Sequence, residues 1–210
     1  MSNAPVNVSV IYYSSTGTTH SMAERLSQTT EKAGAEVRLR QVAELAPQEV
    51  IESMDAWKAH REETKDLPVA QPDDVVWSDV VLFGSPTRFG NVSSQLKQFI
   101  DTLGPQWGQG LLADKVYAGF TSSQTTHGGQ ESTLLALYNT IHHFGGLIVS
   151  PGYTDPVKFA DGNPYGVGHV TGADNDAELG STEYDALDHL AERAVDVARR
   201  LKAGESAGRE

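Results

Sequence analysis

The chain of 210 residues contains no cysteine. This absence excludes disulfides, thiolate nucleophiles, and zinc or iron–sulfur sites built on cysteine. The sequence also has no apolar run approaching the roughly 18–20 residues that cross a bilayer, and residues 1–7 lack the basic and apolar regions of a secretory signal. We therefore expect a cytoplasmic protein with no membrane-inserted segment.

Positive charge is scarce: Lys and Arg number 16 against 28 Asp and Glu, which gives a formal net charge of −12. Nucleic-acid binding draws most of its affinity from Lys and Arg that neutralise phosphates, and the sequence has no basic stripe. The charge therefore argues against a nucleic-acid partner. It names no partner by itself, because acidic surfaces are common on soluble enzymes.

Short apolar runs alternate with stretches of helical periodicity along the chain. The runs predict strands at Val6–Tyr13, Val37–Val42, Val80–Phe83, Val116–Phe120 and Leu147–Val149. Helical spacing of apolar residues follows each strand, ending in a long helix over Tyr184–Leu201. Strand and helix repeated five times predict an α/β fold, an open parallel sheet with helices on both faces.

Two segments exceed this minimal pattern, one near residues 43–75 and one near 153–181. The first is charged with weak helical character, and the second is rich in Gly, Asp, Asn and Pro. Long connections in compact domains are usually functional or disordered. We predict a single domain over residues 1–202 with these two insertions, and a frayed tail over 203–210.

The loop after the first predicted strand combines five hydroxyl side chains with one glycine: Ser14, Ser15, Thr16, Gly17, Thr18 and Thr19. It stands between a buried strand and a helix N-terminus, which supplies backbone N–H donors and a positive helix end to an anion. The loop has no lysine, so it is not a nucleotide-triphosphate loop. It suits a single phosphate, although Ser and Thr here could also serve only as helix caps.

Two further loops follow the third and fourth predicted strands. In the loop Gly84–Ser93, Phe89 offers an apolar face and Arg88 a cation, while Pro86 shapes the turn. Instead of contacting a ligand, Arg88 could form a surface ion pair and Phe89 could pack in the core. The loop Thr121–Glu131 offers small residues and hydroxyls that allow a close approach to a ligand, which is a weak signal alone.

The first loop with its flanking residues, Val10-Ile11-Tyr12-x-Ser14-x-x-Gly17-x-Thr19-x-x-x-Ala23-x-x-Leu26, resembles the flavodoxin fingerprint. The segments Pro86-Thr87-Arg88-Phe89-Gly90-Asn91, Gly128-Gly129-Gln130-Glu131 and Asn163-Pro164-Tyr165-Gly166 resemble the WrbA-type NAD(P)H:quinone oxidoreductases. This resemblance covers about Val6 to Leu201. It implies a flavodoxin-like, doubly wound, five-stranded sheet of order 2-1-3-4-5, FMN as cofactor, NADH or NADPH and quinones as substrates, and a homotetramer.

The resemblance also implies roles for individual residues. It implies that the 5′-phosphate of FMN is bound by Ser14, Ser15, Thr16, Gly17, Thr18 and Thr19. The residues that flank the isoalloxazine ring would be Pro86, Thr87, Arg88 and Phe89. The residues that line the edge of the ring would be Ser122, Ser123, Gln124, Thr125, Thr126 and His127. His143 matches a histidine near the flavin, Trp107 a tryptophan that closes over the substrate, and Thr16 a position that contacts the nicotinamide. We expect Arg88 and His143 to be catalytic, Arg88 by stabilising the reduced flavin and His143 by polarising or protonating the quinone.

Two other motifs give weaker evidence of a functional site. Gly108–Ala113 imitates a dinucleotide fingerprint but follows no strand, so we expect no dinucleotide site there. The side chains of His142 and His143 point in two directions on a helix, so we expect no metal site.

The predicted activity is a two-electron, ping-pong reduction of quinones. The alternatives are a one-electron flavodoxin-type carrier and a non-catalytic regulatory or scaffold flavoprotein.

Overall fold

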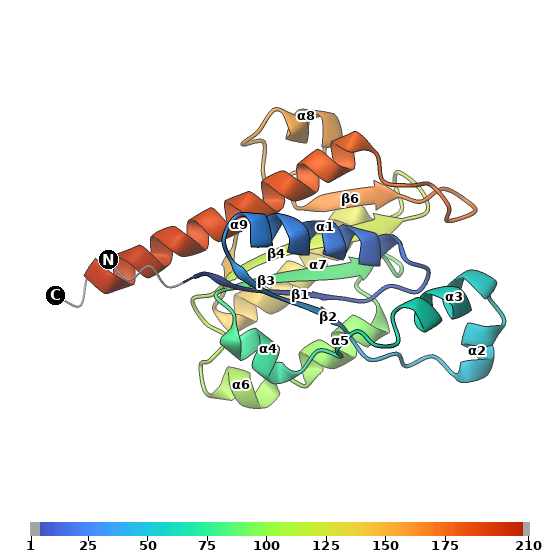
Figure 1. Ribbon diagram of the computed structural model, residues 1–210, viewed down its shortest axis with the longest axis horizontal. Coiled ribbons are helices and arrows are strands. Elements are labelled where there is room, and N and C mark those ends of the chain that lie inside the picture. Colours follow the sequence, from blue (N-terminus) through green and yellow to red (C-terminus); the bar gives the residue numbers. More distant parts are fainter. Residues whose placement is uncertain (1–4, 208–210) are drawn as a thin grey trace.

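The computed structural model describes residues 5–207 and is built on one parallel sheet (Figure 1). Its strands are β1 (Asn7–Tyr12), β2 (Glu36–Gln41), β3 (Val80–Pro86), β4 (Val116–Ser123), β5 (Leu147–Ile148) and β6 (Val167–Val170). Their order is β2-β1-β3-β4-β5, with β6 also paired to β4. The predicted order 2-1-3-4-5 is confirmed.

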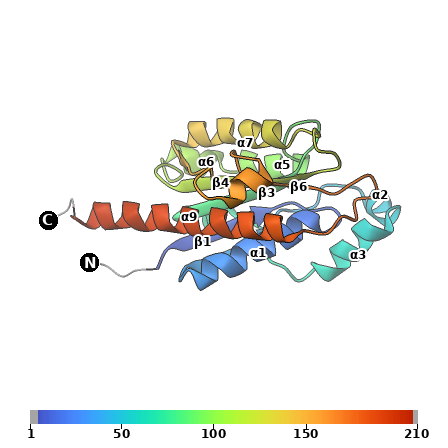
Figure 2. The same ribbon diagram turned by 90° about the horizontal axis from the view of Figure 1, so that it is seen from above.

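Helices cover both faces of the sheet, as predicted (Figure 2). One face carries α1 (Thr18–Lys32) and α9 (Ser181–Ala207), and the other carries α5 (Ser94–Asp101), α6 (Gly104–Gly108) and α7 (Gln130–Phe144). The remaining helices are α2 (Gln48–Glu52), α3 (Asp55–Glu63), α4 (Pro72–Trp77) and α8 (Val157–Asp161). No helix in the described part of the chain is long and apolar enough to span a membrane.

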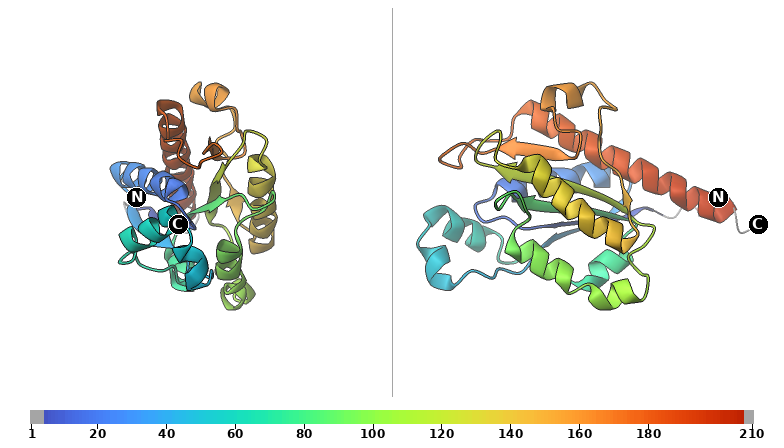
Figure 3. Two further views of the ribbon diagram at one scale, coloured as in Figure 1. Left: turned by 90° about the vertical axis from the view of Figure 1, so that its right-hand side faces the viewer. Right: turned by 180° about the vertical axis from the view of Figure 1, so that it is seen from behind.

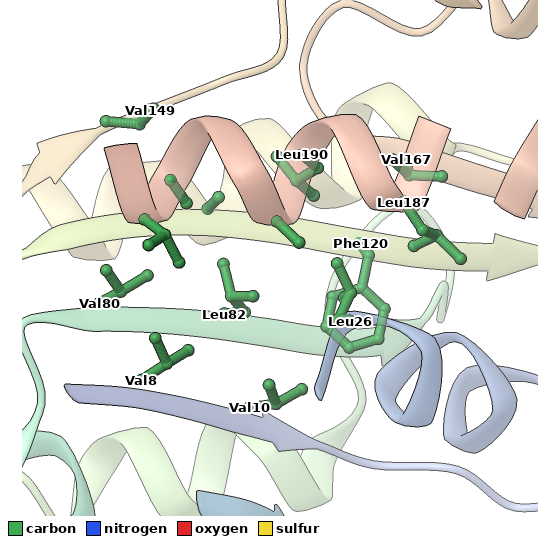
Figure 4. Close-up of a cluster of buried hydrophobic side chains, with 14 of the residues drawn as sticks. Val8, Val10, Leu26, Val80, Leu82, Phe120, Val149, Val167, Leu187 and Leu190 are labelled. Atoms are coloured by element: carbon green, nitrogen blue, oxygen red, sulfur yellow. The ribbon is translucent and has the colours of Figure 1, made fainter. Parts of the chain in front are cut away.

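The central strands are buried on both faces because their side chains alternate between two cores. In β3, Val80 and Leu82 pack beneath α1 and α9 (Figure 4), whereas Val81 and Phe83 pack beneath the opposite helices. Each of these four side chains is fully buried. This double burial explains why the strand reads in the sequence as a continuous apolar run.

The fifth strand position is divided between two segments. β5 pairs with the start of β4, at Val116 and Tyr117, and β6 pairs with its end, from Phe120 to Ser123. The chain leaves the sheet between them and forms α8. The sequence predicted five strands and none within 153–181, whereas β6 in this segment adds a sixth strand to the sheet. Four residues that include a glycine and a histidine gave no strand signal.

A buried ion pair stabilises the segment between β5 and β6. The Lys158 ammonium contacts the Asp161 carboxylate and donates a hydrogen bond to the Gly166 carbonyl, 2.9 Å away. Both side chains are almost completely buried. Burial raises the pKa of Asp161 and lowers that of Lys158, so each depends on its partner to remain charged. The pair thereby fixes the backbone that leads into β6.

The C-terminal helix extends beyond its predicted end. α9 continues to Ala207, whereas the sequence predicted a frayed tail from residue 203. The Lys202 ammonium reaches the Asp79 carboxylate at 2.6 Å and the Pro5 carbonyl at 3.1 Å, which ties the last turns to the sheet. Residues 208–210 of the predicted tail lie outside the described residues.

Replacing Lys158 with methionine should destabilise the protein by about 3–5 kcal/mol, because the Asp161 carboxylate is then left buried and unpaired. Urea denaturation of the variant and the wild type measures the free energy of unfolding. The double variant Lys158→Met/Asp161→Asn, which removes both charges, should lose less than the single one. A single variant as stable as the wild type, or a double variant that is worse, would contradict this account.

Candidate active site

A cavity of about 460 Å³ opens at the carboxyl ends of β1, β3 and β4. Ligands of open α/β sheets bind at this edge, where the strand order reverses. The cavity is lined by Ser14, Ser15, Thr16, Thr18, Thr19, Met54, Trp57, Pro86, Thr87, Arg88, Phe89, Ser122, Ser123, Gln124, Thr125, Gly128, Thr171 and Asn175. The three predicted loops thus converge on one space.

The first wall is the hydroxyl-rich loop between β1 and α1. Gly17 precedes the helix with a φ of 107°, a conformation that side chains other than glycine rarely adopt. Its N–H donates to the Ser14 hydroxyl at 3.1 Å, and the Thr19 hydroxyl lies 3.2 Å from that of Ser122 on β4. These bonds hold the loop and the N-terminus of α1 at the cavity, where their hydroxyl and N–H donors suit an anion although the loop has no cationic side chain.

Two buried histidines lie behind this loop. The Tyr12 hydroxyl is 2.5 Å from Nδ1 of His20, and the His20 ring lies 5.2 Å from that of His60 on α3. Burial, with a further contribution from His20, lowers the pKa of His60, whereas Glu63 opposes this shift. The cluster attaches α3 to the start of α1, where His60 Nδ1 lies close to Gly17.

The second wall is the turn that follows β3. Arg88 and Asn91 exchange two backbone hydrogen bonds of 2.7 and 3.1 Å, and the residues between them, Phe89 and Gly90, both have positive φ, as a type I′ turn requires. Phe89 has a φ of 53°, an unusual value for a bulky residue, and its ring is fully exposed. The turn therefore holds an apolar ring and the Arg88 side chain at the mouth of the cavity.

The third wall comes from the end of β4 and the loop after it. The strand continues through Ser123, so Ser122 and Ser123 belong to the sheet and not to the predicted loop. The Gln130 side chain donates to the Ser123 hydroxyl at 2.9 Å, which joins this wall to the start of α7. Thr126 and His127 lie at the exposed tip of the loop, outside the cavity lining.

Sequence reasoning missed five lining residues: Met54, Trp57, Gly128, Thr171 and Asn175. All but Gly128 belong to the two long insertions. Thr171 follows β6 and binds the Ser123 carbonyl through its N–H at 2.8 Å. The unusual length of the two segments was the only available signal, because their positions depend on contacts with distant parts of the chain.

His143 and Trp107 lie elsewhere in the chain. α7 begins at the cavity and His143 is near its far end, about 20 Å along the helix at 1.5 Å per residue. There the Trp107 indole, on α6, donates to the His143 carbonyl at 2.7 Å. Figure 3 (right) shows α6 beside the C-terminal end of α7. Both side chains are exposed, and neither lines the cavity of its own chain.

Comparison with known proteins identifies the family. Residues 6–155 match the family described as NADPH-dependent FMN reductase. The chain belongs to this family. Two relatives named NAD(P)H dehydrogenase (quinone) cover nearly the whole chain. The one from Deinococcus radiodurans is 46% identical over 94% of this chain and 98% of its own length, and the one from Geotalea daltonii is 38% identical over 93% and 98%.

A solved structure, the flavodoxin, WrbA-like protein from Agrobacterium tumefaciens, superposes with a TM-score of 0.64 at 26% identity. It covers 93% of this chain and 98% of its own. The resemblance to WrbA-type proteins is thus confirmed. As a member of this family the chain is an oxidoreductase with FMN as its cofactor.

The cavity fits FMN by the chemistry of its walls. Hydroxyls and the N-terminus of α1 suit a phosphate ester, whereas Trp57, Met54 and Phe89 suit a planar aromatic ring. Arg88 supplies the one cationic side chain among the lining residues, all of which lie in the described part of the chain. No group of three or more metal-ligating side chains occurs in residues 5–207.

The stability of the protein should fall as the pH drops below about 6.5. His60 is then protonated in the unfolded chain, whereas its lowered pKa keeps it neutral to a lower pH in the folded chain. The slope contributed by one such group is at most about 1.4 kcal/mol per pH unit. We expect the variant His60→Gln to show a shallower decline between pH 7 and 5 than the wild type. Urea denaturation at matched FMN loading measures it.

The variant His142→Gln is the matched control, because His142 is exposed on α7. It should keep the wild-type dependence on pH. Identical pH profiles for the wild type and His60→Gln would show that His60 is not held neutral by its surroundings.

Proposed function

We propose that the chain is an FMN-dependent NAD(P)H:quinone oxidoreductase that reduces quinones to hydroquinones in two-electron steps. The supporting observation is one cavity that combines an anion-binding loop with an apolar and cationic wall open to solvent. The names of the relatives from Deinococcus and Geotalea support the substrate class.

The chain's own residues would hold and tune the cofactor. Bound FMN would supply the hydride transfer between a reduced nicotinamide and a quinone. Ser14, Ser15 and Thr18 would hold its phosphate, and Phe89 would provide an apolar face to its ring. The positive charge of Arg88 would stabilise the negative charge that collects on the ring during reduction. Because Phe89 and Arg88 border one open mouth, NADH or NADPH and the quinone bind there in turn, which makes the kinetics ping-pong.

The purified protein should show the absorption bands of oxidised flavin, lose them when NADH or NADPH is added without oxygen, and regain them with benzoquinone. This cycle follows if both substrates react at one cavity. A flavin that ignores both nicotinamides would favour a one-electron carrier. Failure to bind added FMN would overturn the assignment of the cavity, and a bound flavin that neither the nicotinamides nor a one-electron donor reduces would favour a non-catalytic role.

We also propose that a neighbouring copy supplies His143 and Trp107 to this cavity within a homotetramer. Trp107 is 54% exposed, and Leu111 and Leu147 nearby are 42% and 40% exposed. Exposed large apolar side chains on one end of a molecule suit contact with a second subunit. His143 then reaches a quinone in the partner's cavity, where it polarises the quinone oxygen or donates a proton to it.

Subunit complementation tests this arrangement. Arg88→Ala and His143→Ala should each lower quinone turnover by at least about ten-fold. Hybrids of the two variants, co-expressed with different tags and purified through both, should regain up to about half of wild-type turnover, since one site in two combines both intact residues.

Each outcome of the complementation experiment is decisive. Hybrids no more active than the single variants would contradict a contribution across subunits. Full activity of His143→Ala alone would remove His143 from the reaction. Oligomers of one variant with a single tag, prepared in parallel, provide the control.

A further inference from the structure

Glu44, in the first insertion, is the acceptor of five hydrogen bonds. One carboxylate oxygen accepts the two backbone N–H groups that directly follow it, at 2.8 and 3.0 Å, and the Gln95 side chain at 2.8 Å. The other accepts the Tyr13 hydroxyl at 3.0 Å and the Trp57 indole N–H at 3.1 Å. Burial raises the pKa of Glu44, but these bonds outweigh it and lower the pKa below its ordinary value. The Glu44 carboxylate is therefore held in place by donors on both of its oxygens.

The three side chains that donate to Glu44 come from three parts of the site. Tyr13 directly precedes the phosphate loop, and Gln95 lies in the first turn of α5, shortly after the Arg88–Asn91 turn. Trp57 lies on α3, which borders the carboxyl-end edge of the sheet (Figure 1). Glu44 thus ties two walls of the cavity to the insertion.

Trp57 is placed by this bond at the edge of the cavity. Its indole is half-buried and packs against the core formed with Phe83 and Leu96, and it also lines the cavity beside Met54. Because the indole N–H is held by Glu44, the plane of the ring is fixed before any ligand arrives. A preorganised aromatic wall costs little ordering on binding.

We propose that Trp57 contacts bound FMN as an apolar wall of the cofactor site, and that Glu44 is a positioning residue that fixes the Trp57 indole there. The proposal rests on FMN as the cofactor of this family. It gives the first insertion a role: the segment carries an aromatic ring to the side of the cavity between the phosphate loop and the turn that bears Arg88 and Phe89.

The experiment is a titration of the flavin-free protein with FMN, which measures the dissociation constant, and the visible circular dichroism of the bound flavin. Trp57→Ala should weaken FMN binding by about ten-fold or more and change the dichroism, because an aromatic contact is lost. Trp57→Phe, which keeps a ring, should lose less. Trp77→Phe is the matched control, since Trp77 packs against Arg38 outside the cavity, and it should leave both readouts unchanged.

The positioning role of Glu44 is tested by a double-mutant cycle. Glu44→Gln should weaken FMN binding in the wild type but have little further effect in Trp57→Phe, where no indole N–H remains to be held. An equal effect in both backgrounds would show that Glu44 acts through Tyr13 or Gln95, and would overturn its role toward Trp57.

Two outcomes separate this proposal from the cofactor assignment. Wild-type affinity and dichroism in a folded Trp57→Ala variant, checked by far-ultraviolet circular dichroism, would overturn the contact while leaving FMN as the cofactor. A wild-type protein that binds no FMN would overturn the cofactor assignment and this proposal with it.

Discussion

The register of three parallel strands determines where the cavity forms. Tyr12 of β1, Gly84 of β3 and Phe120 of β4 are aligned neighbours in the sheet. The ladder continues past the strands, where the Tyr13 N–H binds the Gly84 carbonyl at 3.0 Å and the Thr87 N–H binds the Ser122 carbonyl at 2.8 Å. The three loops therefore leave the sheet side by side. A slip of one residue would turn every side chain to the other face and separate the cavity walls.

The hydroxyl-rich loop between β1 and α1 contains no lysine or arginine, in a protein of formal net charge −12. The groups that it offers to an anion are backbone N–H groups, hydroxyls and the helix dipole. Such groups fix the geometry of an anion more strictly than a flexible ammonium does. The Arg88 guanidinium, the cationic side chain of the lining, belongs instead to the turn after β3.

The sequence predicted the parts of the site that follow buried strands. Thr16, Thr87 and Thr125, which line the cavity, each lie in a loop that follows a strand predicted from an apolar run. The family of the protein and its strand order were predicted from the resemblance of its loop motifs to WrbA-type proteins, since the apolar runs alone indicated only an open parallel sheet. The cavity residues Met54, Trp57, Thr171 and Asn175 were not, because no local pattern tells where a long polar insertion will dock.

A hydrogen-bonded carboxylate docks each insertion, half-buried in the first and buried in the second. Glu44 gathers five donors in the first, and Asp161 pairs with Lys158 in the second. Hydrophobic packing alone is non-directional and tolerates sliding, whereas a carboxylate must satisfy each donor at a fixed distance and angle. Directional bonds of this kind suit segments that have little apolar surface to bury. One carboxylate binds Trp57 and the other holds the segment that leads into β6 and Thr171, so the shape of the site depends on two carboxylates that do not line it.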